Sequence, residues 1–216
     1  MIKTGLKELD KFLGGGIKEG LITDVSGQNS TGKTQLMFQI CVNALKDGKE
    51  VLFQDTTGEF RPERLFEIMQ SWGMNASLLD KIKVGRVMNT SQQIQYLSKI
   101  PIKNFSLIII DNVTDLFSFE YSKKEHYFEK NLSFMKYMHN LSSIAINTKI
   151  PIIVTNIVRT INNHEKPNLE KSINPYTHIK IILSKNSNGY LCQATSPFDN
   201  VKFHYSITSN GLTDGS

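Results

Sequence analysis

Cysteine and histidine are scarce in this sequence, which argues against a zinc site. The 216 residues include two cysteines and five scattered histidines, with no paired cysteines at the spacing of zinc ligands. Two cysteines in a chain of this size are typical of a reducing compartment. We therefore expect Cys41 and Cys192 to be reduced residues of the core.

Long apolar runs are also missing. The longest, such as "LIII" at 107–110, are far too short for a membrane span, which requires about 20 apolar residues. The amino terminus, "MIKTGLKELD", lacks the apolar stretch of a signal peptide, and the chain contains no G-x-S-x-G motif of a serine hydrolase. We expect a cytoplasmic protein with no membrane partner.

The overall composition is ordinary for a soluble globular protein, with 39% apolar and 21% charged residues. The length predicts a single domain over residues 1–216 with a substantial core. A formal net charge of +5 suits a polyanionic partner. Many basic proteins bind no nucleic acid, however, so charge alone leaves that question open.

The most informative motif is "GQNSTGKTQ" at 27–35. It fits the phosphate loop G-x-x-x-x-G-K-[ST], in which backbone N–H groups surround phosphates, the lysine reaches the terminal ones and the hydroxyl binds Mg²⁺. An apolar strand precedes the motif, and a helical pattern that ends at Gly48 follows it. The predicted nucleotide-binding residues of the loop are Gly27, Gln28, Asn29, Ser30, Thr31, Gly32, Lys33, Thr34 and Gln35.

The order of apolar segments predicts an α/β fold, with a mainly parallel sheet flanked by helices and antiparallel strands near the carboxyl end. Residues 159–175 are polar and are expected to form a long, mobile loop. A long helix is expected over about 125–148. Its expected core stripe consists of Phe128, Leu132, Met135, Met138, Leu141 and Ala145.

Asp111 ends the apolar run of "LIIIDN". The run predicts a buried strand, so the carboxylate would lie at the carboxyl edge of the sheet, where ligands bind in open α/β folds. Together with Thr34, it is the predicted Mg²⁺ ligand. The alternative is an aspartate that caps a turn.

Four segments carry a resemblance to the ATPase core of the RecA superfamily, and within it to archaeal RadA and RadB and the eukaryotic strand-exchange recombinases. They are "TGLKELDKFLGGGIKEGLITDVSGQNSTGKTQ", "DTTGEFRPERL", "FSFEYSKKEHYFEKN" and "FHYSITSNGLTD". The resemblance covers nearly the whole chain. It implies a RecA-like P-loop NTPase core that binds ATP with Mg²⁺ between protomers and holds single-stranded DNA by two loops.

The resemblance also assigns individual residues. Arg64 matches the arginine that stacks on adenine, and Lys124 and Lys130, with Lys123 beside them, stand in the first DNA loop. Arg159 falls in the segment of the second DNA loop. Without the resemblance, the lysines would indicate a solvated helix start. Because the chain begins at the core, no helical amino-terminal domain is expected, and this size resembles the short RadB-like paralogues.

Three residues depart from the family pattern at functional positions. Thr57 replaces the glutamate that orients the attacking water, Ile157 replaces the glutamine that senses the terminal phosphate, and Thr195 replaces an aspartate that caps ATP from the neighbouring protomer. Glu59 lies two residues beyond Thr57, displaced by roughly 7 Å along an extended chain. It is either a substitute base or a solvated turn residue.

These observations predict a RadB-like ATP-binding accessory protein of homologous recombination and DNA repair. It would bind single-stranded DNA and a full-length recombinase or other repair protein, with weak or no ATP hydrolysis. The first alternative is an active DNA-dependent ATPase that uses Glu59. The second is a KaiC-like signalling or scaffold ATPase without DNA binding, because that branch shares the "TGLKELDKFLGGG" segment.

Overall fold

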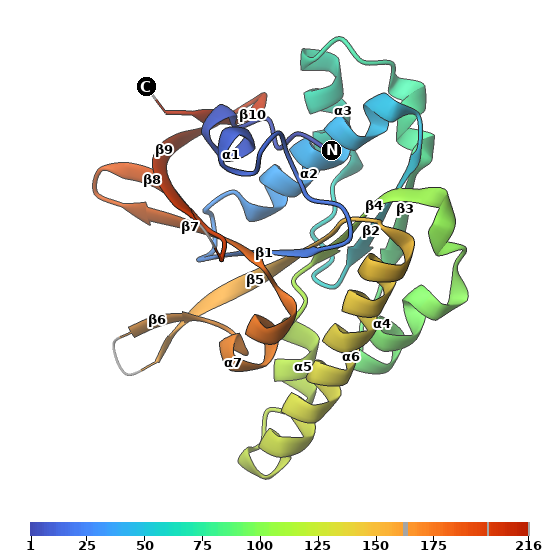
Figure 1. Ribbon diagram of the computed structural model, residues 1–216, viewed down its shortest axis with the longest axis vertical. Coiled ribbons are helices and arrows are strands. Elements are labelled where there is room, and N and C mark those ends of the chain that lie inside the picture. The colour runs from blue at the N-terminus through green and yellow to red at the C-terminus, as the bar shows by residue number, and fades with distance from the viewer. Residues whose placement is uncertain (162–163, 198, 216) are drawn as a thin grey trace.

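The computed structural model describes residues 1–161, 164–197 and 199–215 (Figure 1). The helices are α1 (Lys7–Phe12), α2 (Lys33–Ala44), α3 (Pro62–Ser71), α4 (Thr90–Tyr96), α5 (Asp115–Glu120), α6 (Tyr127–Thr148) and α7 (Glu170–Ile173). The strands are β1 (Ile22–Gly27), β2 (Glu50–Asp55), β3 (Ile82–Arg86), β4 (Phe105–Asp111), β5 (Ile152–Ile161), β6 (His164–Pro167), β7 (Ile179–Asn186), β8 (Gly189–Thr195), β9 (Asn200–Thr208) and β10 (Gly211–Asp214).

The strands form one mixed sheet in the order β10-β9-β8-β7-β1-β5-β4-β2-β3, with β6 paired to β5 beside this path. Strands β1 to β5 and β7 run parallel, whereas β7 to β10 pair antiparallel. The predicted fold class is therefore confirmed. The runs of Ile, Val and Leu in β4 and β5 are suited to this position, because central parallel strands are buried on both faces.

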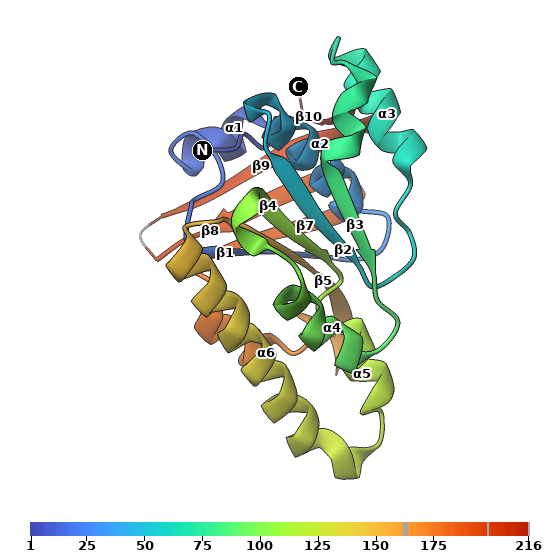
Figure 2. The ribbon, with the colours of Figure 1, turned by 90° about the vertical axis from the view of Figure 1, so that its right-hand side faces the viewer.

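Two hydrophobic clusters lie on opposite faces of the sheet. One joins α1, α2 and α3 to the sheet, and the other joins α4, α5, α6 and α7 to the opposite face. Figure 2 shows α6 beside one face and α2 and α3 beyond the other. Cys41 and Cys192 are free and buried, as expected. No helix of the described chain is both long and apolar enough to cross a membrane.

The structure corrects the loop expected over residues 159–175. Strand β5 continues to Ile161, β6 pairs antiparallel with it, and α7 follows. Residues 162 and 163 lie outside the described part of the chain. The polar composition was misleading because the two strands of a hairpin can satisfy their backbone groups by pairing with each other, without an apolar face.

The expected core stripe on α6 is also only partly correct. Met138, Leu141 and Ala145 are buried, but Phe128, Leu132 and Met135 are exposed. The two sets lie on different faces of one helix. Helical spacing showed that each set shares a face, yet only the packed structure decides which face meets the sheet.

A buried carboxyl group lies in the central strand. Asp24 on β1 is 3% exposed, with Val154 of β5 and Lys180 of β7 as its neighbours across the sheet. Its Oδ1 has no hydrogen-bond partner among the described residues. Burial raises the pKa of Asp24 to about 7; the positive charge of Lys180 opposes this shift and the negative charge of Glu170 adds to it.

This raised pKa predicts that the protein loses stability as the pH rises from about 4 to about 7. In that window the folded protein retains a proton that the unfolded chain, with an ordinary pKa of 3.8, has already released. The loss amounts to at most about 4 kcal/mol. Asp24→Asn should therefore be more stable than wild type at pH 8, and the difference should shrink at pH 5. Urea unfolding measures the free energy of unfolding across this range, with the exposed Asp80→Asn as the control. The same pH dependence of that free energy in all three proteins would contradict the prediction.

Candidate functional site

The phosphate-loop motif lies between the central strand and a helix. Strand β1 ends at Gly27 and α2 begins at Lys33. Gly32 has φ +85°, a left-handed conformation that glycine adopts without strain. A Cβ on Gly27 would lie 2.3 Å from the carbonyl oxygen of Leu183, so the close approach of β7 requires glycine there. The loop therefore sits at the carboxyl edge of β1, with the amino terminus of α2 facing it.

The Lys33 side chain folds back onto the phosphate loop. Its Nζ donates hydrogen bonds to the carbonyl oxygens of Gly27 at 2.8 Å and Gln28 at 2.7 Å. Burial lowers the pKa of Lys33, while the negative charges of Asp111 and Glu59 oppose that shift. The ammonium group is thus partly desolvated. A phosphate bound in the loop would add negative charge beside it and so favour its protonated form.

Asp111 lies where the sequence predicted it, at the end of β4. Its carboxylate accepts hydrogen bonds from the hydroxyl of Thr34 at 3.0 Å and from that of Thr155 at 2.5 Å. Burial raises the pKa of Asp111, and both hydroxyl contacts act in the opposite direction. The structure thus brings the predicted pair Thr34 and Asp111 together. Thr155, which orients Asp111 from β5, was missed, although it directly follows an apolar run as Asp111 does.

The residues present fit a nucleotide with Mg²⁺. Glycines open the loop, Lys33 supplies a cation, and Thr34 and Asp111 supply oxygen ligands suited to Mg²⁺. No group of three or more Cys, His, Asp and Glu side chains converges within the described ranges. A metal at Thr34 and Asp111 would therefore take further ligands from phosphate oxygens and water.

Arg64 lies beside the start of α2. Its Nε donates to Oε1 of Gln35 at 2.9 Å, its Nη2 donates to the carbonyl oxygen of Thr208 at 3.1 Å, and its Nη1 pairs with Glu67 at 2.5 Å. The guanidinium is therefore fixed between α2, α3 and the β9–β10 turn. This position is compatible with the predicted contact to a base, because the guanidinium is hydrogen-bonded to Gln35, the last residue of the loop motif.

The turn that carries Thr57 is fixed by a carboxylate. Asp55 Oδ1 accepts hydrogen bonds from the backbone N–H of Thr57 at 3.0 Å, its hydroxyl at 3.1 Å and the N–H of Gly58 at 2.7 Å. The Thr57 hydroxyl is thus committed within its own turn. Glu59 is exposed, but its charge raises the pKa of both Lys33 and Asp111. The charge of Asp55, in the same turn, also raises the pKa of Asp111.

The predicted DNA-binding residues are distributed over two neighbouring segments. Lys123 and Lys124 lie between α5 and α6, Lys130 lies over the ring of Tyr127 at 5.8 Å in the first turns of α6, and Arg159 lies on β5. Arg159 pairs with Asp115 at the start of α5, with 3.1 Å between Nη2 and Oδ1. Arg159 and Ser122, the residue before Lys123, line the same hollow.

A polar network joins these two segments. The Asn168 side chain, beyond β6, donates to the hydroxyls of Thr114 at 2.9 Å and Ser118 at 2.8 Å. Thr114 in turn donates to Asn156 of β5 at 2.8 Å, and Asn156 donates to the carbonyl oxygen of Asn168 at 2.8 Å. Sequence reasoning missed this network. Its members are far apart in the chain, and only Asn156, directly after the apolar run of β5, gave a signal.

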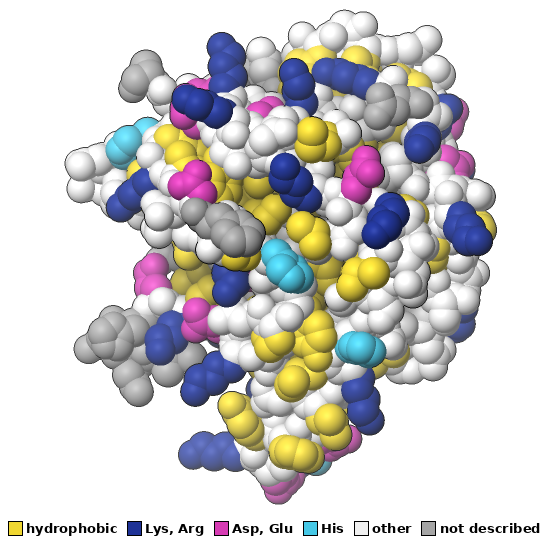
Figure 3. Space-filling view, viewed as in Figure 1, with side chains coloured by type: hydrophobic (Ala, Val, Ile, Leu, Met, Phe, Trp, Pro, Cys, Tyr) yellow, Lys and Arg dark blue, Asp and Glu magenta, His cyan; other side chains and the backbone are white. Residues whose placement is uncertain are grey.

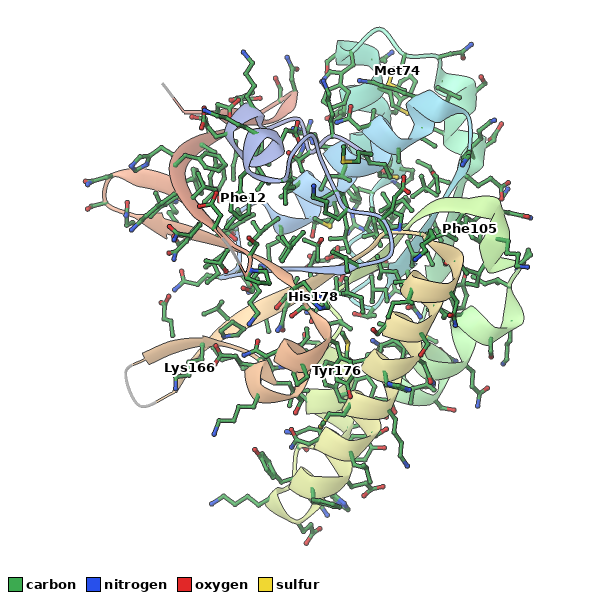
Figure 4. The ribbon with its side chains drawn as sticks, in the orientation of Figure 1. Phe12, Met74, Phe105, Lys166, Tyr176 and His178 are labelled. Atoms are coloured by element: carbon green, nitrogen blue, oxygen red, sulfur yellow. The ribbon has the colours of Figure 1, made fainter. Side chains whose placement is uncertain are left out.

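The β5–β6 hairpin also contacts the phosphate loop. The Gln28 side chain donates a hydrogen bond to the carboxylate of Glu165 on β6. Figure 1 shows β6 projecting beside β5 and β7, and in Figure 4 the neighbouring Lys166 points away from the body of the molecule. Glu165 therefore connects the segment expected to be the second DNA loop to the predicted phosphate site.

This sheet order, with a phosphate loop after β1 and an acidic residue after β4, defines a RecA-like α/β fold of the phosphate-loop class. The chain belongs to the Rad51 family, whose model matches residues 1–214. A crystal structure of the RadB recombinase is similar over the full length of both chains, with a TM-score of 0.81 and 29% identity. The expected superfamily and the likeness to RadB are confirmed.

Relatives identified by sequence carry names from DNA repair and recombination. RadA of Cenarchaeum symbiosum (strain A), a DNA repair and recombination protein, is 37% identical over 169 residues, 73% of this chain and 42% of its own length. The DNA repair protein RAD51 homolog A of Zea mays is 32% identical over 168 residues, 73% of this chain and 49% of its own length. The chain thus spans about half the length of these relatives. It is a member of a recombinase family.

The contact between Gln28 and Glu165 predicts that Glu165 opposes nucleotide binding. A carboxylate beside the phosphate loop repels an entering polyphosphate, so Glu165→Gln should tighten ATP binding by roughly threefold to tenfold at low ionic strength. The gain should largely disappear in about 0.5 M salt. A titration with a fluorescent ATP analogue at low and high salt measures both affinities, with Glu125→Gln, in the exposed segment before α6, as the control. Weaker binding by Glu165→Gln would show that the contact supports the nucleotide-binding form instead.

Proposed function

We propose that this chain is a RadB-like accessory protein of homologous recombination and DNA repair that binds ATP with Mg²⁺ and hydrolyses it weakly or not at all. One observation carries the proposal. The groups that bind phosphate and metal are assembled around Lys33, Thr34 and Asp111, whereas Thr57, at the position of the family's catalytic glutamate, has a hydroxyl committed to Asp55.

The binding role follows from the loop. The backbone of Gly27–Gly32 and the ammonium of Lys33 would hold the phosphates, Thr34 and Asp111 would hold Mg²⁺, and Arg64 would contact the base. ATP would supply a terminal phosphoryl group whose transfer to water depends on positioning that water. Thr57 cannot accept a proton as a carboxylate does, so this chain lacks the expected base at that position.

Single-stranded DNA is the proposed polyanionic ligand. The lysines between α5 and α6 are exposed and lie near aromatic rings, a combination that suits a strand backbone and its bases. Arg159 would have to exchange its ion pair with Asp115 for a phosphate. A hollow of about 490 Å³ next to this ion pair is lined by Thr57 and by Phe119, among others, which supports a DNA segment close to the proposed nucleotide site.

The partner is proposed to be a full-length recombinase or another repair protein. Family members of about twice this length make such an accessory role plausible for a chain that matches their ATPase core. In this role ATP acts as a conformational ligand. The network through Asn156 and Asn168 and the contact of Glu165 with Gln28 connect the loop to the segments proposed to bind DNA.

A second candidate function, an active DNA-dependent ATPase, is favoured by one observation. The charge of Glu59 acts on both Lys33 and Asp111, so a modest rearrangement of its turn would bring a carboxylate to the phosphate site. This alternative has the same fold and ligands as the first. It differs only in whether Glu59 orients the attacking water.

Single-turnover phosphate release from ATP, with and without single-stranded DNA, distinguishes the two functions. We expect saturable ATP binding that Lys33→Ala weakens by at least about tenfold. Phosphate release by the wild-type protein should be no faster than release by Lys33→Ala. Because the proposal assigns no base to Glu59, Glu59→Gln should leave phosphate release unchanged. Rapid DNA-stimulated release that disappears in Glu59→Gln would replace our proposal with the active ATPase.

DNA binding has its own test in the salt dependence of affinity. If Lys124 and Lys130 contact phosphates, the double variant Lys124→Ala/Lys130→Ala should bind single-stranded DNA more weakly. Its slope of log K against log salt should be shallower by about 0.7 per lost contact. Fluorescence anisotropy between 50 and 300 mM salt measures the slope, and exposed Lys99→Ala serves as the control. An unchanged slope would remove these lysines from the proposed DNA site.

A further inference from the structure

An apolar surface lies on α6, away from the nucleotide site. Phe128, Leu132 and Met135 are 77%, 43% and 37% exposed, and their spacing of four and three residues places them on one face of the helix. We call these three residues the α6 stripe. The opposite face of α6, with Phe134, packs into the core. Figure 3 shows hydrophobic side chains gathered along this part of the molecule.

A hollow of about 430 Å³ adjoins the stripe. Leu132, Met135, Lys136, His139, Asn140 and Tyr176 line it. Tyr176 comes from the short 3₁₀ helix Asn174–Tyr176 after α7, and its ring centroid lies 6.5 Å from that of His139. Figure 4 shows Tyr176 next to α6. The volume exceeds that of any single side chain, so one large apolar group of a partner fits within it.

The walls of this hollow are fixed. The Ser172 hydroxyl of α7 donates to Oδ1 of Asn131 on α6 at 2.6 Å, and Ile173 is fully buried against the same cluster as Phe134. The hollow therefore exists before anything binds, which lowers the entropy cost of docking. The hollow has apolar side chains on two sides, Leu132 and Met135 from α6 and Tyr176 from the 3₁₀ helix, so it can receive the apolar face of a partner's amphipathic helix.

The charges around the hollow favour an acidic occupant. Lys136 lines it directly, and exposed Lys171 precedes Ser172 on α7. None of the described residues that line the hollow is an aspartate or a glutamate, and Glu129, one turn before the hollow on α6, lies 3.3 Å from His126. A partner with carboxylates flanking its apolar face would therefore meet cations here.

A second copy of this chain fits the surface poorly. The hollow extends along α6 from Leu132 to Asn140, so its midpoint falls at Lys136. A two-fold axis through the hollow would place the Lys136 ammonium groups of two copies against each other. Like charges at the centre of a partly apolar interface are unfavourable, which disfavours self-association through this face.

We propose that the α6 stripe and its hollow form a docking surface for an acidic amphipathic helix of another protein. That helix would need about three turns, or 16 Å. It inserts one large apolar side chain between Met135 and Tyr176 and places carboxylates beside Lys136. The proposal does not depend on ATP binding or on the DNA-binding lysines.

Designed peptides test this surface directly. The probe is a fluorescent 16-residue helical peptide with Phe and Leu at i, i+4 and i+7 and glutamates on both flanks; the comparison peptides are a scrambled version and a version with lysine flanks. We expect the acidic peptide to bind with a Kd of about 100 µM or tighter. Met135→Glu should weaken binding of the acidic peptide at least tenfold, because the variant places a charge in the apolar hollow. Lys136→Glu should weaken binding of the acidic peptide and strengthen binding of the lysine-flanked peptide.

The matched control is Ile146→Glu, an exposed apolar position on the same helix, 11 residues beyond Met135. Circular dichroism and thermal unfolding should confirm that all variants fold, as expected for exposed positions. Equal binding of the scrambled peptide, or equal loss in Ile146→Glu, would overturn the proposal. A wild-type dimer in sedimentation that Met135→Glu dissociates would assign the surface to a second copy. A loss of DNA affinity in Met135→Glu equal to that of Lys124→Ala would assign it to nucleic acid.

Discussion

The parallel alignment of β1, β5 and β4 is the constraint on which the rest of this structure depends. Ile152 of β5 lies opposite Ile22 of β1 on one side and Ile108 of β4 on the other. Because the strands run the same way in this register, the ends of β1 and β4 fall at the same edge of the sheet, beside Thr155 and Ile157 of β5. The phosphate loop, Asp111 and Thr155 therefore meet at one edge of the sheet, although 128 residues separate Gly27 from Thr155. Burial on both faces makes this register costly to shift.

The Asp111 carboxylate shows how the edge becomes a site. It accepts hydrogen bonds from the hydroxyls of Thr34 and Thr155, and its burial leaves it poorly solvated. A buried carboxylate of this kind suits the proposed role of Mg²⁺ ligand, because a cation would stabilise its charge. Next to it, Asn156 connects β5 to Thr114 and Asn168. Hydrogen bonds thus connect the phosphate loop and β5 to the β5–β6 hairpin and the segment after it.

The proposed functions divide the surface of the molecule into three regions. The carboxyl edge of the sheet would bind the nucleotide, the segments around Lys124 and Arg159 would bind a DNA strand, and the α6 stripe would bind a protein helix. Their chemistry differs accordingly, with backbone N–H groups and a lysine at the first, exposed cations near rings at the second, and apolar side chains with one flanking lysine at the third. Under this proposal, a chain with Thr57 at the position of the catalytic base would act through binding, with the ligands of separate surfaces influencing one another's affinity.

The sequence alone determined the fold class, the phosphate loop and the place of Asp111, because strand and helix periodicities and the loop spacing are local properties. It also indicated the family, through motifs that follow one another in the chain. Tertiary structure alone decided which face of α6 is buried and that polar residues 164–167 form a strand. It also brought Thr155 to Asp111 and Glu165 to Gln28. These features arise from contacts between residues distant in sequence, whose free energies depend on packing that no local pattern encodes.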